Sequence, residues 1–189
     1  MTTGEPEKLV EGRGCKGCTM CCKLLGVKEL DKPQMVWCEH CTVGVGCKIY
    51  ESRPLECSAF HCDYLKRPEL DERWYPKNSR MVVVYRGQER AMAVYVDPSR
   101  KDAWRKAPFY AQIKMWANNL CPQHGQVVVW EGDNAVAVLP NRDKPLGHGD
   151  PGQLVAVFEK MTPQGMIYDA VLMDKGASVD SVMHKVGKS

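Results

Sequence analysis

The sequence concentrates its cysteines in one short stretch near the N-terminus. Nine of the ten cysteines lie between Cys15 and Cys62, and only Cys121 lies outside. Disulfide frameworks usually spread their cysteines over a whole small domain, whereas thiols crowded into a quarter of a chain suit metal binding. We therefore expect this stretch to fold irregularly around a metal centre, and Cys121 to be an ordinary buried thiol.

Two pairs of cysteines have the two-residue gap that lets both sulfurs reach one metal ion, in CKGC (15–18) and in CEHC (38–41). The first pair extends to CKGCTMCC, which contains the C-x2-C-x2-C run of bacterial ferredoxins. The sequence predicts nine metal ligands, namely Cys15, Cys18, Cys21, Cys22, Cys38, Cys41, Cys47, Cys57 and Cys62.

Cys21 and Cys22 are adjacent, and adjacent side chains in an extended or turn conformation point in different directions. We therefore expect these two thiols to serve different metals or different corners of one larger cluster. His40 and His61 lie beside predicted ligands, but sulfur is already plentiful, so both are kept as reserve ligands.

The spacing allows two kinds of metal. Zinc takes four ligands, so eight cysteines would hold two Zn²⁺ ions and nine could hold three with bridging thiolates. The ferredoxin-like run would instead wrap a 4Fe-4S cluster, with Cys57 or Cys62 as a remote ligand and Cys22 serving a second cluster or ion. The run favours one or two 4Fe-4S clusters over two or three Zn²⁺ ions and leaves both open.

Residues 15–62 resemble the YkgJ-type cysteine-cluster family, described as CxxCxxCC zinc- or iron-chelating domains. The segments that carry the resemblance are CKGCTMCC (15–22) and GCKIYESRPLECSAFHC (46–62). The resemblance implies a metal-binding protein and, because related segments occur in flagellin lysine methylases with an iron–sulfur cluster, an alternative as a protein-modifying enzyme. Cys41 is absent from the family pattern, which makes it the candidate spare thiol.

A second alternative is a zinc-stabilised module that binds nucleic acid or protein. Residues 63–120 carry 12 Lys and Arg against 7 Asp and Glu, and this segment also contains four aromatic residues, Trp74, Tyr75, Trp104 and Tyr110. The basic residues are scattered and the formal net charge is only +3, so the sequence does not favour nucleic acid. It identifies no protein partner or substrate.

In the predicted support around Cys57, Arg53 balances the charge of the thiolates. Ile49 and Tyr50 are expected to pack behind the cysteines, and Pro54 to begin a short helix or turn.

Beyond the cysteines the pattern changes to that of a packed body. Three hairpins are expected, in 80–98, in 126–140 around Gly132, and across TPQG in 153–173. Residues 98–119 read as helix, capped by Ser99 and kinked or restarted at Pro108, and LGHGDPG (146–152) reads as a plain loop.

The predicted fold class is α+β, an irregular cysteine-rich metal-binding region on an antiparallel-sheet body with one or two helices. The predicted organisation is a flexible N-terminus (1–14), the cysteine cluster (15–62), a connector (63–79), the body (80–174) and a polar tail (175–189), together one compact unit. No apolar run approaches the ~20 residues needed to span a bilayer. With no secretory signal at the N-terminus, we expect a cytoplasmic protein.

Overall fold

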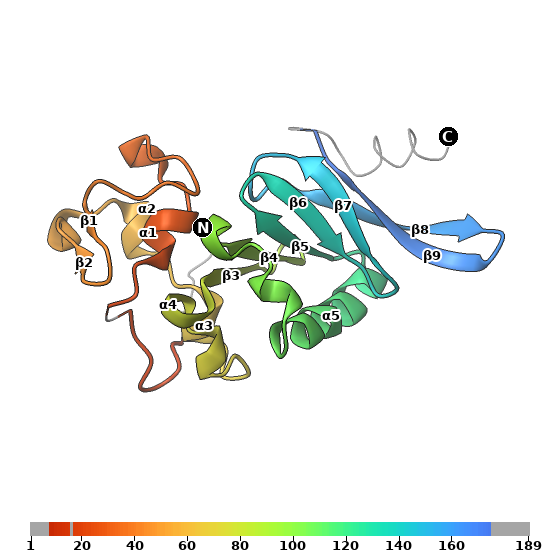
Figure 1. Cartoon of the computed structure of the whole chain (residues 1–189), viewed down its shortest axis with the longest axis horizontal. Helices are drawn as coiled ribbons and strands as arrows, with labels where there is room; N and C mark the ends of the chain where they lie inside the picture. Colours follow the sequence, from red (N-terminus) through yellow and green to blue (C-terminus); the bar gives the residue numbers. More distant parts are fainter. Residues whose placement is uncertain (1–7, 16, 175–189) are drawn as a thin grey trace. The chain divides into compact units, whose positions relative to one another are not determined.

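The computed structural model describes residues 8–15 and 17–174 and divides the chain into two compact units, Met1–Val84 and Tyr85–Ser189 (Figure 1). Helices and strands are both present, so the predicted α+β class is confirmed. The division falls inside strand β3 (Met81–Arg86), a few residues after the predicted start of the body. The predicted polar tail, 175–189, and the first seven residues of the predicted flexible N-terminus lie outside the described residues.

The first unit is built from short elements joined by loops. Its helices are α1 (Met20–Leu24), α2 (Leu55–Ser58), α3 (Asp63–Lys66) and α4 (Pro76–Ser79); its 3-10 turns are η1 (Lys28–Leu30), η2 (Tyr50–Ser52) and η3 (Glu72–Trp74); and its strands before β3 are β1 (Cys41–Thr42) and β2 (Gly46–Cys47). Helices this short are not stable alone, so the unit depends on contacts between elements.

A small apolar core supports the first unit. Leu24 and Leu70 have no exposed surface, and Met20 and Trp74 are 2% and 1% exposed. Met20 and Leu24 belong to α1, which carries two of the predicted ligands, whereas Leu70 and Trp74 follow the last one. The buried apolar residues therefore lie near both ends of the cysteine stretch, and its middle consists of short elements and loops.

The second unit contains the longest helix and all of the main sheet except the first four residues of β3. The five-stranded sheet has the order β3-β4-β5-β6-β7, and a separate hairpin pairs β8 with β9. The strands after β3 are β4 (Ala91–Val96), β5 (Gln126–Glu131), β6 (Asn134–Val138), β7 (Asp143–His148), β8 (Val155–Thr162) and β9 (Gly165–Leu172); the helix is α5 (Phe109–Leu120), with 3-10 turns η4 (Pro98–Arg100), η5 (Ala103–Arg105) and η6 (Cys121–Gln123).

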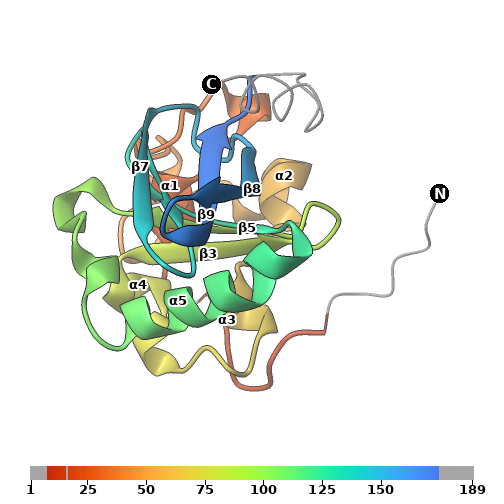
Figure 2. The same ribbon diagram turned by 90° about the vertical axis from the view of Figure 1, so that its right-hand side faces the viewer.

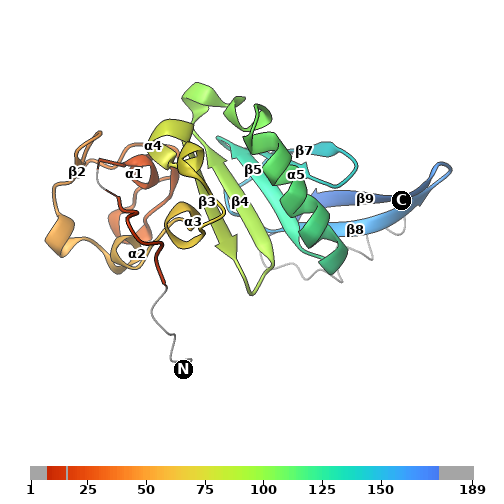
Figure 3. The ribbon, with the colours of Figure 1, turned by 90° about the horizontal axis from the view of Figure 1, so that it is seen from below.

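Helix α5 lies along strand β5, as Figures 2 and 3 show from two directions. The predicted apolar stripe of α5 is buried at Ile113 and Trp116 and half-buried at Phe109 and Leu120. None of the helices in the described ranges combines the length and the apolar character needed to cross a membrane.

The expectation that all sheet strands pair antiparallel is wrong for one pair. β4 runs parallel to β5, with Ala91 opposite Gln126 and Val96 opposite Glu131. Helix α5 lies between these strands in sequence, and a strand–helix–strand crossover brings the second strand back in the same direction as the first. The continuous apolar run of β4, all six residues of which are buried, is typical of a strand covered on both faces.

Two of the predicted hairpins are confirmed. β5 and β6 pair antiparallel and end at Glu131 opposite Asn134, and β8 and β9 end at Thr162 opposite Gly165. Both strands of the first predicted hairpin are present as β3 and β4. The Arg90 N–H closes their connection by donating to the Gly87 carbonyl at 3.2 Å.

Two other predictions of local structure are wrong. Residues 98–105 form the 3-10 turns η4 and η5 instead of one helix, and the cap is the side chain of Asp97, which accepts the Ser99 N–H at 2.9 Å. α5 begins directly after Pro108, as the restart predicted. The predicted loop at 146–152 begins inside β7, an outer strand whose Pro145 and Gly147 obscured it in the sequence.

Candidate metal centre

All nine predicted ligands lie in the first unit, and all ten cysteines of the chain are free thiols. Cys121, expected to be an ordinary buried thiol, lies in the second unit and is 2% exposed. Burial raises the pKa of Cys121 to about 11, so this thiol is inert at neutral pH. The candidate metal centre is therefore confined to the first unit.

The CKGC segment closes as a tight turn. The Cys18 N–H donates to the Cys15 carbonyl at 2.9 Å, and Gly17 has a φ of +67°, which glycine adopts without strain. The sulfur of Cys18 accepts hydrogen bonds from the main-chain N–H groups of Met20 and Lys77. Such donors favour the thiolate, which is the form of cysteine that binds metal.

Cys21 and Cys22 lie in helix α1, so the expectation of an extended or turn conformation is wrong for them. Neighbouring side chains in a helix are rotated by about 100°, so the two thiols still leave the chain in different directions. The Cys22 thiol forms hydrogen bonds with the thiols of Cys21 and Cys41. Its main-chain carbonyl also accepts the Cys38 N–H at 2.9 Å, which makes Cys22 the link between α1 and the CEHC turn.

The CEHC turn leads into the hairpin formed by β1 and β2. The Cys41 N–H donates to the Cys38 carbonyl at 3.0 Å, and Cys41 lies directly opposite Cys47 in the hairpin. Side chains at opposite positions of a hairpin point to the same face, so the Cys41 and Cys47 side chains lie on the same face of this hairpin. The N–H of Gly44, in the hairpin turn, donates to Thr19 Oγ1 at 3.1 Å and ties the hairpin to the start of α1. We call Cys38, Cys41 and Cys47 the hairpin thiols.

Cys57 lies in α2. This short helix begins directly after Pro54, as predicted. Its thiol interacts electrostatically with three other predicted ligands, Cys22, Cys38 and Cys47. Cys57 therefore belongs with the hairpin thiols.

Cys62 is in a different position, immediately before α3. Its sulfur accepts the main-chain N–H groups of Tyr64 and Leu65, and its thiol interacts electrostatically with Cys15 and Cys18. We call Cys15, Cys18 and Cys62 the second group; Cys15 and Cys18 also interact electrostatically with Cys22, and Cys15 with Arg53.

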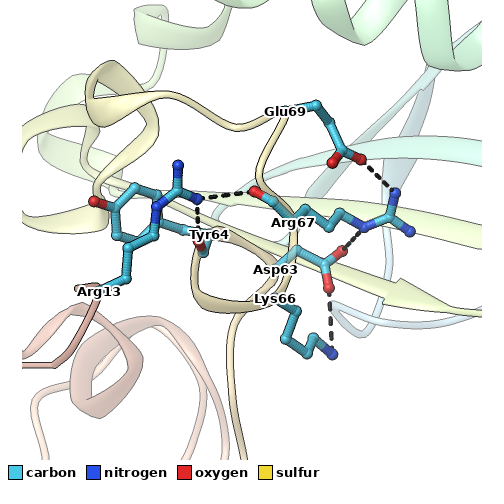
Figure 4. A network of polar contacts seen from close by, with 6 residues as sticks. All are labelled: Arg13, Asp63, Tyr64, Lys66, Arg67 and Glu69. Atoms are coloured by element: carbon cyan, nitrogen blue, oxygen red, sulfur yellow. Dashed lines mark hydrogen bonds and ion pairs between the residues drawn. The ribbon is translucent and has the colours of Figure 1, made fainter. Parts of the chain in front are cut away.

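Arg13 joins the two chain segments that carry this second group (Figure 4). Its Nη1 donates to the carbonyls of Tyr64 at 2.6 Å and Arg67 at 2.8 Å, and its guanidinium lies 4.4 Å from the centre of the Tyr64 ring. Arg13 thus caps the C-terminal end of α3, where a cation is favoured. Arg13 was not among the predicted site residues, although it lies only two positions before Cys15.

Lys32 is a buried cation beside the thiols, with 8% of its surface exposed. Its Nζ donates to the carbonyls of Lys23 at 3.1 Å and Pro33 at 2.9 Å, and also to that of Leu25. None of the carboxylates in the described ranges forms an ion pair with it. Burial lowers the pKa of Lys32, and the charges that oppose this shift come from four cysteines, Cys38, Cys22, Cys21 and Cys57. Nothing in its local sequence marked this residue.

Arg53 interacts electrostatically with Cys47 and Cys57, and its guanidinium lies 3.7 Å from the centre of the Tyr50 ring. The prediction that Tyr50 packs behind the cysteines is wrong, because its ring is 57% exposed and stacks on Arg53. Lys32 and Arg53, which lie 21 positions apart in the sequence, both place positive charge beside the thiols.

Six of the nine predicted ligands have a raised pKa and so hold their protons tightly. Burial is the main reason that the pKa is raised in five of them, Cys15, Cys18, Cys41, Cys57 and Cys62. The pKa of Cys41 and of Cys62 rises to about 11. The pKa of Cys22 is raised most of all, first by its hydrogen bond with Cys21 and then by burial. Metal binding would have to displace these protons.

The thiols do not form a closed coordination shell. Within residues 8–15 and 17–174, no three Cys, His, Asp or Glu side chains meet in an arrangement that could hold a metal ion. The reserve ligand His40 has its Nε2 atom 3.4 Å from Glu39 Oε1. The donor chemistry fits a thiophilic metal, but binding would require the sulfurs to be drawn together.

Two of the four aromatic residues predicted for a nucleic-acid surface, Trp74 and Trp104, are buried, whereas Tyr75 and Tyr110 are half-buried. Trp74, in the first unit, is 1% exposed. Trp104, in the second unit, has no exposed surface, and its Nε1 donates to Glu131 Oε1 at 2.6 Å. Stacking with bases needs an exposed ring face, which Trp74 and Trp104 do not offer.

In comparisons with known proteins, the chain matches no protein-family model, no curated protein and no solved structure. The resemblance to the YkgJ-type family therefore rests on the cysteine motifs alone.

Proposed function

We propose that this chain is a cytosolic metal-binding protein whose first unit holds an iron–sulfur cluster or zinc ions through its nine N-terminal cysteines. The motif resemblance to the YkgJ-type family supports this proposal. So do ten free thiols, which suit a reducing compartment.

The observation that carries the proposal is the position of Lys32. A buried ammonium group is costly unless an opposite charge compensates it, and the three carbonyls that it contacts carry no net charge. No carboxylate in the described part of the chain pairs with it, whereas four cysteines interact with it electrostatically. Metal-bound thiolates would supply the missing negative charge.

Iron–sulfur is the favoured form of the centre. The CKGCTMC run has the spacing that wraps three thiolates around a 4Fe-4S cluster, with a fourth ligand from elsewhere in the chain. Zinc remains the other outcome, because the CEHC turn and its hairpin also suit a tetrahedral thiolate site. The cluster would be held by thiolates and surrounded by the N–H donors and cations described above.

The test is metal analysis of the full chain purified without oxygen. Iron with an equal amount of acid-labile sulfide and visible absorption would identify iron–sulfur, whereas zinc in a colourless protein would identify the alternative. Cys18→Ser and Cys57→Ser should each lose metal, with Cys121→Ser as the matched control that keeps it. A folded preparation that contains neither metal and takes up neither on anaerobic reconstitution would overturn the proposal.

A further inference from the structure

We infer that Cys41 and Cys47 are a reversible disulfide pair, which a small-molecule disulfide such as oxidised glutathione would oxidise. The pair follows from the hairpin of β1 and β2 alone and needs no metal. Oxidation would also withdraw two of the nine predicted ligands, and this effect on metal binding rests on the proposed function.

The first argument is the register of the hairpin. Cys41 is paired directly with Cys47. One position further from the turn, the Lys48 N–H donates to the His40 carbonyl at 2.8 Å. Hydrogen-bonded and non-hydrogen-bonded pairs alternate along an antiparallel ladder, so Cys41 and Cys47 form a non-hydrogen-bonded pair. The Cys41 N–H agrees with this assignment, because it donates outside the ladder, to the Cys38 carbonyl.

The second argument is distance. The Cα atoms of a non-hydrogen-bonded pair are about 4.5 Å apart, and the two side chains leave the same face of the ladder. A disulfide needs Cα atoms about 4.4–6.8 Å apart and Cβ atoms about 3.5–4.5 Å apart. Cys41 and Cys47 can therefore be joined without a change of register in the hairpin.

Two other pairings that the sequence suggests fit less well. Cys38 and Cys41 lie at the ends of one turn, where the Cα atoms can be as much as about 7 Å apart, at the far limit of the disulfide range. Cys21 and Cys22 are neighbours in α1, so their side chains are rotated by about 100° from each other. A bond between these two would distort the helix.

Cys22 is the competing partner of Cys41, because the two thiols form a hydrogen bond. However, Cys22 lies in α1, and its main chain is joined to the CEHC turn instead of to β1. The ladder holds Cys47 opposite Cys41 through the pairs on both sides, which a contact between two side chains does not do. Cys47 is therefore the partner that the fold favours.

Small molecules can reach this part of the first unit. Cys41 and Cys47 are half-buried. Val43 and Val45, in the turn that connects them, are 57% and 74% exposed. Cys121, by contrast, is 2% exposed and closed to an oxidant.

The oxidation is a thiol–disulfide exchange in two steps. The thiolate of one cysteine attacks a sulfur of oxidised glutathione, which forms a mixed disulfide and releases one glutathione thiolate. The thiolate of the other cysteine then attacks the chain's sulfur in that mixed disulfide and releases the second glutathione. The chain loses two electrons and two protons, and one oxidised glutathione becomes two reduced molecules. Because metal binds the thiolate form, the disulfide and a metal centre that uses these two sulfurs exclude each other.

The experiment treats the metal-free full chain with oxidised glutathione, blocks the remaining thiols by alkylation and cleaves the chain after glutamate. Cleavage at Glu39 and Glu51 places Cys41 and Cys47 in one peptide, 40–51, which contains no other cysteine. Mass spectrometry should find that this peptide lacks two hydrogen atoms and carries no alkyl group. Treatment with a reducing dithiol before alkylation should restore both thiols.

Three controls accompany this measurement. Cys47→Ser removes the partner and should leave Cys41 as a mixed disulfide with glutathione. Cys121→Ser should form the bond as the unaltered chain does. The chain unfolded in urea should lose the preference for this pairing, because the hairpin that sets it is then absent. Since the main measurement uses the unaltered chain, it stays informative if Cys47→Ser does not fold.

The effect on metal has its own readout, the rate at which the bond forms. Zn²⁺ at ten times its dissociation constant should slow the reaction about tenfold, because only the metal-free fraction of the chain then reacts.

The inference is overturned if oxidation joins Cys41 to Cys38 or Cys22, which would link two peptides, or if peptide 40–51 keeps both thiols. Failure of the proposed function is a different result, in which the bond forms between Cys41 and Cys47 at a rate that Zn²⁺ does not change and the chain binds no metal. That result would support the pair and overturn its effect on metal binding.

Discussion

The Nζ atom of Lys32 donates a hydrogen bond to the main-chain carbonyl of Leu25, the residue that directly follows helix α1. The bond holds a buried positive charge one turn away from Cys21 and Cys22. Lys32→Met would remove this charge and keep most of the apolar side chain. We expect the variant to bind metal about tenfold more weakly or worse, measured by competition with a chelator. The exposed Lys28→Met is the control, and equal affinities of the two variants would contradict the prediction.

Because the thiols must lose their protons to bind metal, we expect the affinity for metal to depend on pH. The pKa of the Cys41 and Cys62 thiols is about 11, so both are protonated at neutral pH before metal arrives. Each thiol that becomes a ligand releases one proton, and the apparent affinity then rises about tenfold per pH unit for each proton released. Calorimetry of Zn²⁺ binding in buffers of different ionisation enthalpy counts these protons. An affinity that does not change with pH near neutrality would contradict thiol ligation.

Cys41 offers a direct comparison within the hairpin. The sequence makes it the candidate spare thiol, but the structure gives it Cys47 as its cross-strand partner and Cys22 as a hydrogen-bond partner. These surroundings favour revising the expectation, so we expect Cys41→Ser to lose as much metal as Cys47→Ser. Metal analysis of the two purified variants is the measurement. A Cys41→Ser protein with its full metal content would return Cys41 to the role of spare.

The raised pKa of Tyr64 leads us to expect a loss of folding stability at high pH. Burial and a hydrogen bond to Glu72 raise the pKa of Tyr64 to about 12, from 10.0 in the absence of these contacts. Because the folded state holds this proton more tightly, its contribution to stability is present below about pH 10 and is lost as the pH rises towards about 12. Urea unfolding should therefore show a smaller loss between about pH 9 and about pH 11 for Tyr64→Phe than for the unaltered chain. Tyr50→Phe, which changes a 57% exposed ring, should behave as the unaltered chain does.

Ile113 tests the packing of α5 without touching a thiol. Its side chain has no exposed surface, so Ile113→Ala should lower the free energy of unfolding of the second unit by about 2–5 kcal/mol. Met115→Ala, in the same helix but 47% exposed, should cost less than about 1 kcal/mol. Both variants should keep their metal, because all predicted ligands lie in the first unit. Loss of metal from Ile113→Ala alone would show that the two units do not behave independently.

Local signals in the sequence were sufficient for much of the second unit. Gly132 and Asp133 predicted the turn between β5 and β6, and TPQG predicted the turn between β8 and β9, because short turns specify antiparallel neighbours. The parallel pairing of β4 with β5 could not be read in the same way. It depends on where α5 packs after the chain has crossed the sheet, which is a property of tertiary structure.

The candidate site was predictable in its residue types and less so in its geometry. Cysteine spacing predicts nine ligands, which stays a prediction, and the CKGC and CEHC segments close as the tight turns that this spacing favours. The grouping of Cys62 with Cys15 depends on Arg13 and α3, which lie far apart in sequence. Lys32 gave no signal, because a lysine becomes informative only when its burial and its lack of a carboxylate are known.

Strand β7 is the last in the order of the main sheet, and its sequence limits what can be added to that side. Pro145 has no N–H to offer, Gly147 has a φ of +81°, and the pairing with β6 shifts register at Ala135 and Val136. A strand from another molecule would find there neither a continuous row of donors nor a flat edge. The irregularity that hid β7 in the sequence thus makes this strand a poor template for pairing with another chain.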